Sequence, residues 1–156
     1  MPILLNLTKY TQNKRVGMKK ILVTGGAGFI GSHLTTRLVE EGYEVKVYDN
    51  LLRGNKLDSK IISQIELVVD DVRNYESILE HTRECDVIFH FAAVLGVDIV
   101  ADNPVETMEV ETIGTRNIAH AALKNGVNKI MYASTSGIYG HSAMEKAATE
   151  TIIVDP

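Results

Sequence analysis

Four glycines follow a short apolar run, residues 21–23, near the start of this sequence: Gly25, Gly26, Gly28 and Gly31. Glycine permits a tight turn and lets backbone N–H groups approach phosphate oxygens without a Cβ in the way. The first turn of a following helix would add free N–H groups and a partial positive charge. A strand, a glycine turn and a helix start therefore predict a site for the pyrophosphate of a dinucleotide. The expected contacts in this segment are Gly25, Gly28, Phe29, Ile30 and Gly31.

An acidic residue, Asp49, ends a second expected strand and is followed by Asn50. A carboxylate at this place accepts hydrogen bonds from the adenosine ribose and repels a 2′-phosphate, so Asp49 and Asn50 predict NAD rather than NADP. Arg53 is the counter-evidence, because a nearby arginine can accommodate that phosphate. The alternative is a glycine-rich turn without a ligand, and the acid in the correct place argues against it.

The apolar runs predict the elements that position these residues. The expected strands cover residues 21–23, 44–49, 65–69, 86–91 and 129–133. The expected helices run from the glycine turn to about Glu41, over residues 75–81, and from Asn103 and Pro104 to Asn125 and Gly126. Strands alternating with helices predict an α/β fold, a Rossmann-type doubly wound parallel sheet of order 3-2-1-4-5, with the cofactor across the strand ends between strands 1 and 4.

Four short segments, residues 24–34, 70–73, 90–93 and 134–140, resemble motifs of one family and occur in its order. The chain thereby resembles the extended short-chain dehydrogenase/reductases, the NAD-dependent epimerase/dehydratase group. This resemblance implies NAD as the cofactor and a nucleotide-activated sugar as the substrate. It also implies a fold truncated before the last strands and the substrate domain.

The resemblance assigns roles to residues after the third and fourth strands. It implies that Asp71 accepts a hydrogen bond from the adenine amino group and that Val72 packs on the adenine ring. It also implies that Phe91, Ala92 and Ala93 pass under the nicotinamide side of the cofactor, where small side chains allow a close approach.

After the fifth strand, the resemblance implies that Ser134 lies at the cofactor and that Thr135 is the catalytic hydroxyl that bonds the sugar oxygen. The resemblance also implies that Tyr139 is not the catalytic base. His90 is expected to be a packing residue at a strand end. The histidines show neither helical pairing nor cysteine partners, so no metal site is expected.

The catalytic Tyr-x-x-x-Lys pair of the family does not follow Gly140 in this sequence. The resemblance therefore implies the NAD-binding part of an enzyme that works through a transient 4-keto sugar, inactive as this chain alone. A non-catalytic dinucleotide-binding regulatory module and a reductase of a small carbonyl compound are the alternatives, and Thr135 favours the first reading. Glu111 stands where the family usually has Asn, and a carboxylate cannot donate as an amide does.

The 156 residues are 45% hydrophobic and 23% charged, which suits one soluble domain. We expect residues 1–17 to be a disordered extension and residues 18–156 to form the dinucleotide-binding domain. The net charge of −4 argues against nucleic acid or an anionic membrane as partner, and no apolar run reaches the roughly 18 residues of a bilayer span. The single cysteine, Cys85, excludes an intramolecular disulfide and predicts a cytoplasmic location. A homodimer is left open.

Overall fold

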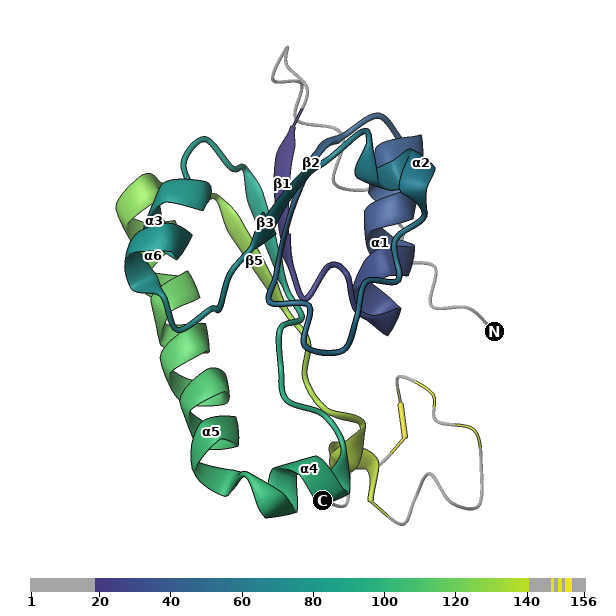
Figure 1. Ribbon diagram of the computed structural model, residues 1–156, viewed down its shortest axis with the longest axis vertical. Helices are drawn as coiled ribbons and strands as arrows, with labels where there is room; N and C mark the ends of the chain where they lie inside the picture. The colour runs from purple at the N-terminus through teal and green to yellow at the C-terminus, as the bar shows by residue number, and fades with distance from the viewer. Residues whose placement is uncertain (1–18, 141–146, 148, 150, 153–156) are drawn as a thin grey trace.

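The computed structural model describes residues 19–140, 147, 149, 151 and 152, which form a parallel sheet with helices on both faces (Figure 1). The strands of these residues are β1 (Lys20–Thr24), β2 (Glu44–Asp49), β3 (Glu66–Val69), β4 (Val87–His90) and β5 (Lys129–Tyr132). Their order is β3-β2-β1-β4-β5, so the predicted strand order and the doubly wound α/β fold class are confirmed. The order reverses between β1 and β4, which pair directly.

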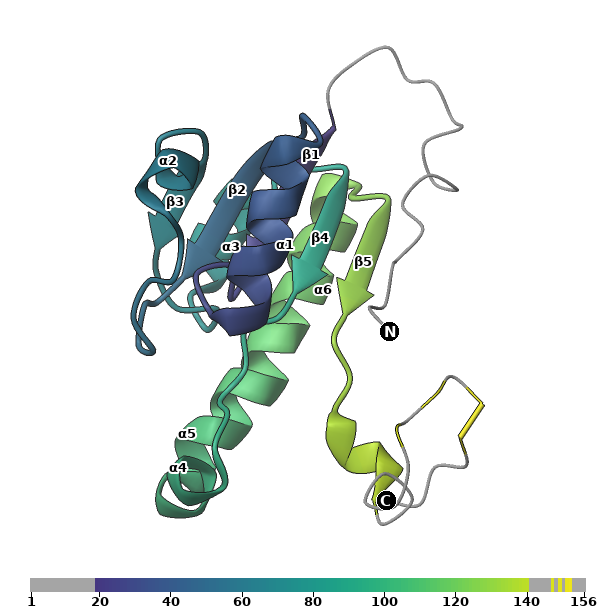
Figure 2. The same ribbon diagram turned by 90° about the vertical axis from the view of Figure 1, so that its right-hand side faces the viewer.

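Helices cover the two faces of the sheet in separate groups. Figure 1 shows α1 and α2 on one face and α3 and α6 on the other. The helical segments are α1 (Phe29–Glu40), α2 (Ser59–Ile62), α3 (Tyr75–His81), α4 (Val97–Asp102), α5 (Pro104–Glu109), the π-helical turn η2 (Val110–Gly114), α6 (Thr115–Asn125) and the 3₁₀ turn η3 (Ser136–Tyr139). Figure 2 shows α1 in front of the sheet, and η3 below the carboxyl end of β5.

The period of two along each strand divides the apolar side chains between two core layers. In β1, Ile21 and Val23 pack with Leu38 of α1, whereas Leu22 packs on the opposite face with Ile118 of α6. All five side chains are nearly or fully buried, and burying such a side chain contributes about 1.5–3 kcal/mol. The two layers fix the sheet between its helices and thereby place the strand ends at one edge.

The connection between β4 and α6 differs from the single long helix expected after Asn103. A further helix, α4, precedes Asn103, whose side-chain amide donates to the carbonyl of Ile99 instead of capping α5. Pro104 begins α5 as predicted, and the chain then widens into the η2 turn before α6. The predicted stop is confirmed, because Gly126 follows α6 with a φ of 68°.

Residues 1–17, expected to be an extension, lie outside the described residues. Among the residues that are described, no helix has the length and apolar character needed to cross a membrane.

Candidate dinucleotide-binding site

The glycine turn begins where β1 ends, and its first residue has no room for a side chain. Gly25 has a φ of 68°, and a Cβ built on it would lie 2.7 Å from the backbone nitrogen of Ala92 and 2.7 Å from the carbonyl carbon of Phe91. Only glycine lets the segment after β4 pass this close to the turn. The turn and residues 91–92 are therefore in direct contact.

The helix start packs against the same turn. A Cβ on Gly31 would overlap the carbonyl oxygen of Gly25 and lie 2.7 Å from the Cα of Gly26. A Cβ on Gly28 would meet only that carbonyl oxygen within 4 Å, at 3.3 Å. Gly28 is the N-cap of α1 and provides no side-chain cap. The N–H groups of the first turn of α1 have no partner within their own helix and no side-chain cap, so this helix end can bind an anion.

Asp49 is bonded to the glycine turn from the end of β2. The N–H of Ala27 donates to Oδ2 of Asp49 over 3.0 Å, and the N–H of Leu51 donates to Oδ1 over 2.8 Å. Each carboxylate oxygen retains acceptor capacity after these bonds. Asn50 is exposed, and its side-chain oxygen accepts from the N–H of Leu52 over 3.1 Å. Contact of Asp49 and Asn50 with a ribose stays a prediction.

Asp71, after β3, is engaged by Arg73. The guanidinium donates from Nε to Oδ1 over 2.9 Å and from Nη2 to Oδ2 over 2.8 Å. These hydrogen bonds hold the pKa of Asp71 below its usual value. The same guanidinium reaches Glu106 and Glu109 of α5 at 3.4 and 3.2 Å. The carboxylate that is expected to meet the adenine is thus ionised and oriented by its neighbour.

Val72 has a packing role that the motif did not reveal. Its side chain is 4% exposed, and a Cβ on Gly114 would lie 2.6 Å from its Cγ2 atom. The widened η2 turn therefore lies directly on Val72. The expected packing of Val72 on an adenine ring stays a prediction.

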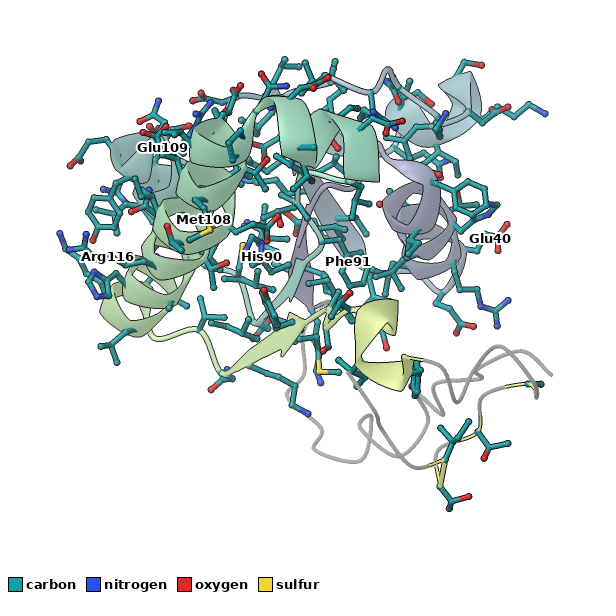
Figure 3. All side chains as sticks on the ribbon, turned by 90° about the horizontal axis from the view of Figure 1, so that it is seen from below. Glu40, His90, Phe91, Met108, Glu109 and Arg116 are labelled. Atoms are coloured by element: carbon teal, nitrogen blue, oxygen red, sulfur yellow. The ribbon has the colours of Figure 1, made fainter. Side chains whose placement is uncertain are left out.

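The segment after β4 is held from two sides. Figure 3 looks onto the carboxyl ends of the strands and shows His90 and Phe91 between the α5–α6 layer and α1. Phe91 and Ala92 are partly buried, whereas Ala93 is exposed. The N–H of Val94 donates to Oε1 of Glu111 over 2.9 Å. Glu111 therefore contacts this segment as an acceptor, a role that needs no amide donor.

His90 is buried, and both of its ring nitrogens lie within hydrogen-bond distance of a hydroxyl. Nδ1 lies 2.6 Å from Oγ1 of Thr24, and Nε2 lies 3.2 Å from Oγ1 of Thr115. Sequence reasoning placed His90 at a strand end but missed Thr24. A hydroxyl at the end of an apolar strand, directly before a glycine turn, is the signal that could have identified it.

Ser134 and Thr135 follow β5 and are exposed. Oγ1 of Thr135 accepts a hydrogen bond from the N–H of Gly137 over 3.1 Å and so caps η3. The Thr135 hydroxyl keeps its own hydrogen for donation. Hydrogen bonds and close contacts thus link the glycine turn to Asp49 and to residues 91–92, whereas Thr135 stands on the separate η3 segment.

Comparisons with known proteins agree with this geometry. The model of the NAD-dependent epimerase/dehydratase family matches residues 21–156. A UDP-N-acetyl-α-D-glucosaminuronate decarboxylase of Bacillus cytotoxicus is 42% identical over 123 residues, which are 78% of this chain and 38% of the relative. A putative UDP-glucose 4-epimerase of Methanocaldococcus jannaschii is 39% identical over 77% of this chain and 39% of the relative.

Among solved structures, the NAD complex of UDP-glucose 4-epimerase from Thermus thermophilus superposes with a TM-score of 0.74 at 36% identity, over 88% of this chain and 44% of that one. The chain spans less than half the length of each of these relatives. NAD, the expected cofactor, is the cofactor that the family description names. With the fold, the glycine turn and the match over residues 21–156 in agreement, this chain belongs to the NAD-dependent epimerase/dehydratase family.

Proposed function

We propose that this chain is the NAD-binding part of an enzyme that epimerises, dehydrates or decarboxylates a nucleotide-activated sugar through a transient 4-keto sugar. The observation that carries the proposal is the uncapped N-terminus of α1 at Gly28, next to the carboxylate of Asp49. Relatives named as UDP-sugar epimerases and decarboxylases support the substrate class. The absence of turnover by this chain alone stays a prediction.

The residues at the strand ends fit the parts of NAD in order. The N–H groups that follow Gly28 would bind the pyrophosphate, and the free acceptor capacity of Asp49 would take the adenosine ribose. Asp71 would accept from the adenine amino group. The backbone of residues 91–93 would lie along the nicotinamide side. Bound NAD would supply the hydride acceptor for oxidation of the sugar.

Thr135 would orient the sugar on the other side of this site. Its hydroxyl hydrogen, not used in capping η3, would be donated to the sugar oxygen that is oxidised. Such a hydrogen bond positions the substrate but takes up no proton near neutral pH. The general base must therefore be another group.

Calorimetric titration with NAD and with NADP tests the cofactor site. We expect the wild-type chain to bind NAD at least tenfold more tightly, because the Asp49 carboxylate repels a 2′-phosphate. Asp49→Asn should reduce this preference, since the amide has no charge. Asp58→Asn is the matched control, because Asp58 also accepts from a backbone N–H, that of Lys60, but at the start of α2. Equal or tighter binding of NADP by the wild type would contradict the assignment and favour Arg53 as the determinant.

A further inference from the structure

The hydroxyl of Thr24 is the centre of a buried hydrogen-bond group at the end of β1. Its Oγ1 lies 3.2 Å from the nitrogen of Phe91, 3.3 Å from the nitrogen of Ala92 and 2.6 Å from Nδ1 of His90. Thr24 is fully buried, so water does not compete for these bonds. Both amides can only donate, and the hydroxyl has a single hydrogen. The N–H of Phe91 is shared, because it also donates to the Thr24 carbonyl over 3.0 Å. The Thr24 hydroxyl therefore accepts from Ala92 and from this shared N–H, and it donates to His90.

This donation fixes the tautomer of His90. Nδ1 must be an unprotonated acceptor, so the proton of the neutral ring lies on Nε2 and is donated to Oγ1 of Thr115 over 3.2 Å. The ring of Tyr132 in β5 lies against the His90 ring, with the ring centroids 5.7 Å apart. Burial lowers the pKa of His90 to about 4, in agreement with a neutral ring near pH 7.

The bonded amides belong to the segment that touches the glycine turn. Thr24 and His90 are register partners of β1 and β4, at the point where the strand order reverses. The nitrogen of Ala92 and the carbonyl group of Phe91 leave no space for a Cβ on Gly25. The carbonyl oxygen of Gly25 in turn accepts from the N–H of Gly28 over 3.2 Å. A shift of the segment after β4 is therefore transmitted to the turn that would hold the pyrophosphate.

We propose that Thr24 and His90 are positioning residues of the cofactor site: together they hold the segment of residues 91–92 against the glycine turn, in the geometry that NAD binding requires. This inference rests on the proposed function, because it concerns the same site. Neither side chain needs to touch the cofactor. The backbone already holds Phe91, whose N–H donates to the Thr24 carbonyl over 3.0 Å, and the Thr24 hydroxyl extends this hold to the N–H of Ala92.

A merely structural hydrogen-bond group would stabilise the fold without affecting cofactor affinity, so both quantities must be measured. Thr24→Val keeps the shape of the side chain and removes the hydroxyl, whereas Thr24→Ser keeps the hydroxyl. Thr82→Val is the matched control. Thr82 is also fully buried, and its hydroxyl bonds the carbonyl of Ile78 and the amide of Asn125 away from the glycine turn.

We expect Thr24→Val to weaken NAD binding at least tenfold at a temperature where the variant is folded, since it removes the buried hydroxyl that bonds the N–H of Ala92 and Nδ1 of His90. The NAD affinity of Thr24→Ser should stay within about twofold of the wild-type value, because the hydroxyl is kept. Thr82→Val should lose thermal stability but keep the wild-type affinity. Equal affinities for Thr24→Val and Thr82→Val would overturn the inference and leave the proposed function intact, whereas a wild-type chain without affinity for NAD would refute both.

Nitrogen NMR of the histidine rings tests the arrangement without cofactor, with His90→Asn identifying the signal. In the wild type at pH 7 we expect a neutral His90 ring with its proton on Nε2. In Thr24→Val this tautomer should lose its preference, because Nδ1 no longer has a donor. A wild-type ring with its proton on Nδ1, or a charged ring, would refute the proposed hydrogen-bond directions.

Discussion

Replacement of Gly31 by alanine tests how tightly α1 is packed on the glycine turn. The added Cβ would overlap the carbonyl oxygen of Gly25 and lie 2.7 Å from the Cα of Gly26, so each near neighbour is a backbone atom. The turn cannot move aside without loss, because the N–H of Gly25 donates to the carbonyl of Tyr48 over 2.9 Å. We therefore expect the collision to destabilise the folded chain.

The size of this effect follows from two opposing contributions. Overpacking in a region that cannot relax costs about 1–3 kcal/mol. Alanine is a better helix former than glycine by up to about 1 kcal/mol, and this offsets part of the cost. A net loss of about 2 kcal/mol would lower the melting temperature of a chain of this length by roughly 4–8 °C.

Gly28→Ala is the matched variant, because its Cβ would meet a single atom at 3.3 Å and otherwise point into open space. We expect a loss of no more than about 1 kcal/mol of stability, as for an alanine at an N-cap. We also expect NAD affinity to fall at least tenfold, since the methyl group would occupy the place proposed for the pyrophosphate. Urea unfolding of both variants measures the free energy of unfolding, and calorimetric titration measures the affinity for NAD. If Gly31→Ala were as stable as the wild type, the proposed packing of α1 on the turn would be refuted. If Gly28→Ala bound NAD as tightly as the wild type, the phosphate assignment would be refuted.

Two further predictions concern His90 and Arg73. Between pH 6.5 and about 4, the unfolded chain protonates His90 while the folded chain keeps the ring neutral. The free energy of unfolding of the wild type should therefore decrease as the pH falls. This decrease should be steeper than in His90→Asn by about 1.4 kcal/mol per pH unit. Equal slopes in urea unfolding would contradict a buried neutral ring. Arg73→Ala should weaken NAD binding roughly tenfold, because Asp71 loses the charged partner that orients it, whereas Arg83→Ala at the opposite end of the sheet should not. Similar titration curves for the two arginine variants would argue against a role of Asp71 at the adenine.

The strand order could be predicted from the sequence because its signals are local. Each apolar run is followed by a turn or helix signal, and parallel strands joined by right-handed crossovers leave few possible arrangements. The glycine turn was recognisable for the same reason. Both ends of α3, residues 75 and 81, agree with the prediction.

The β4–α6 connection could not be predicted in this way. Pro104 marks a helix start, but α4 begins after Gly96 without a side-chain cap. The η2 turn has no local signal either. It widens where Gly114 lies on Val72 and where Glu111 accepts from Val94. Both contacts join segments far apart in the sequence, so a helical pattern read along the chain does not contain them.

The hydrogen bonds that hold the glycine turn come from several neighbouring elements. Asp49 bonds it from the end of β2, the Thr24 hydroxyl bonds the adjoining residues 91–92 after β4, and Gly31 lets α1 pack directly against it. Such a turn has little freedom to lose when an anion binds, and a smaller ordering cost means tighter binding. Glycine has the largest intrinsic backbone freedom of any residue type, so the turn depends on its neighbours to restrict it. The affinity of this site should therefore depend as much on Asp49 and Thr24, which restrict the turn, as on the glycines, which give the phosphate access.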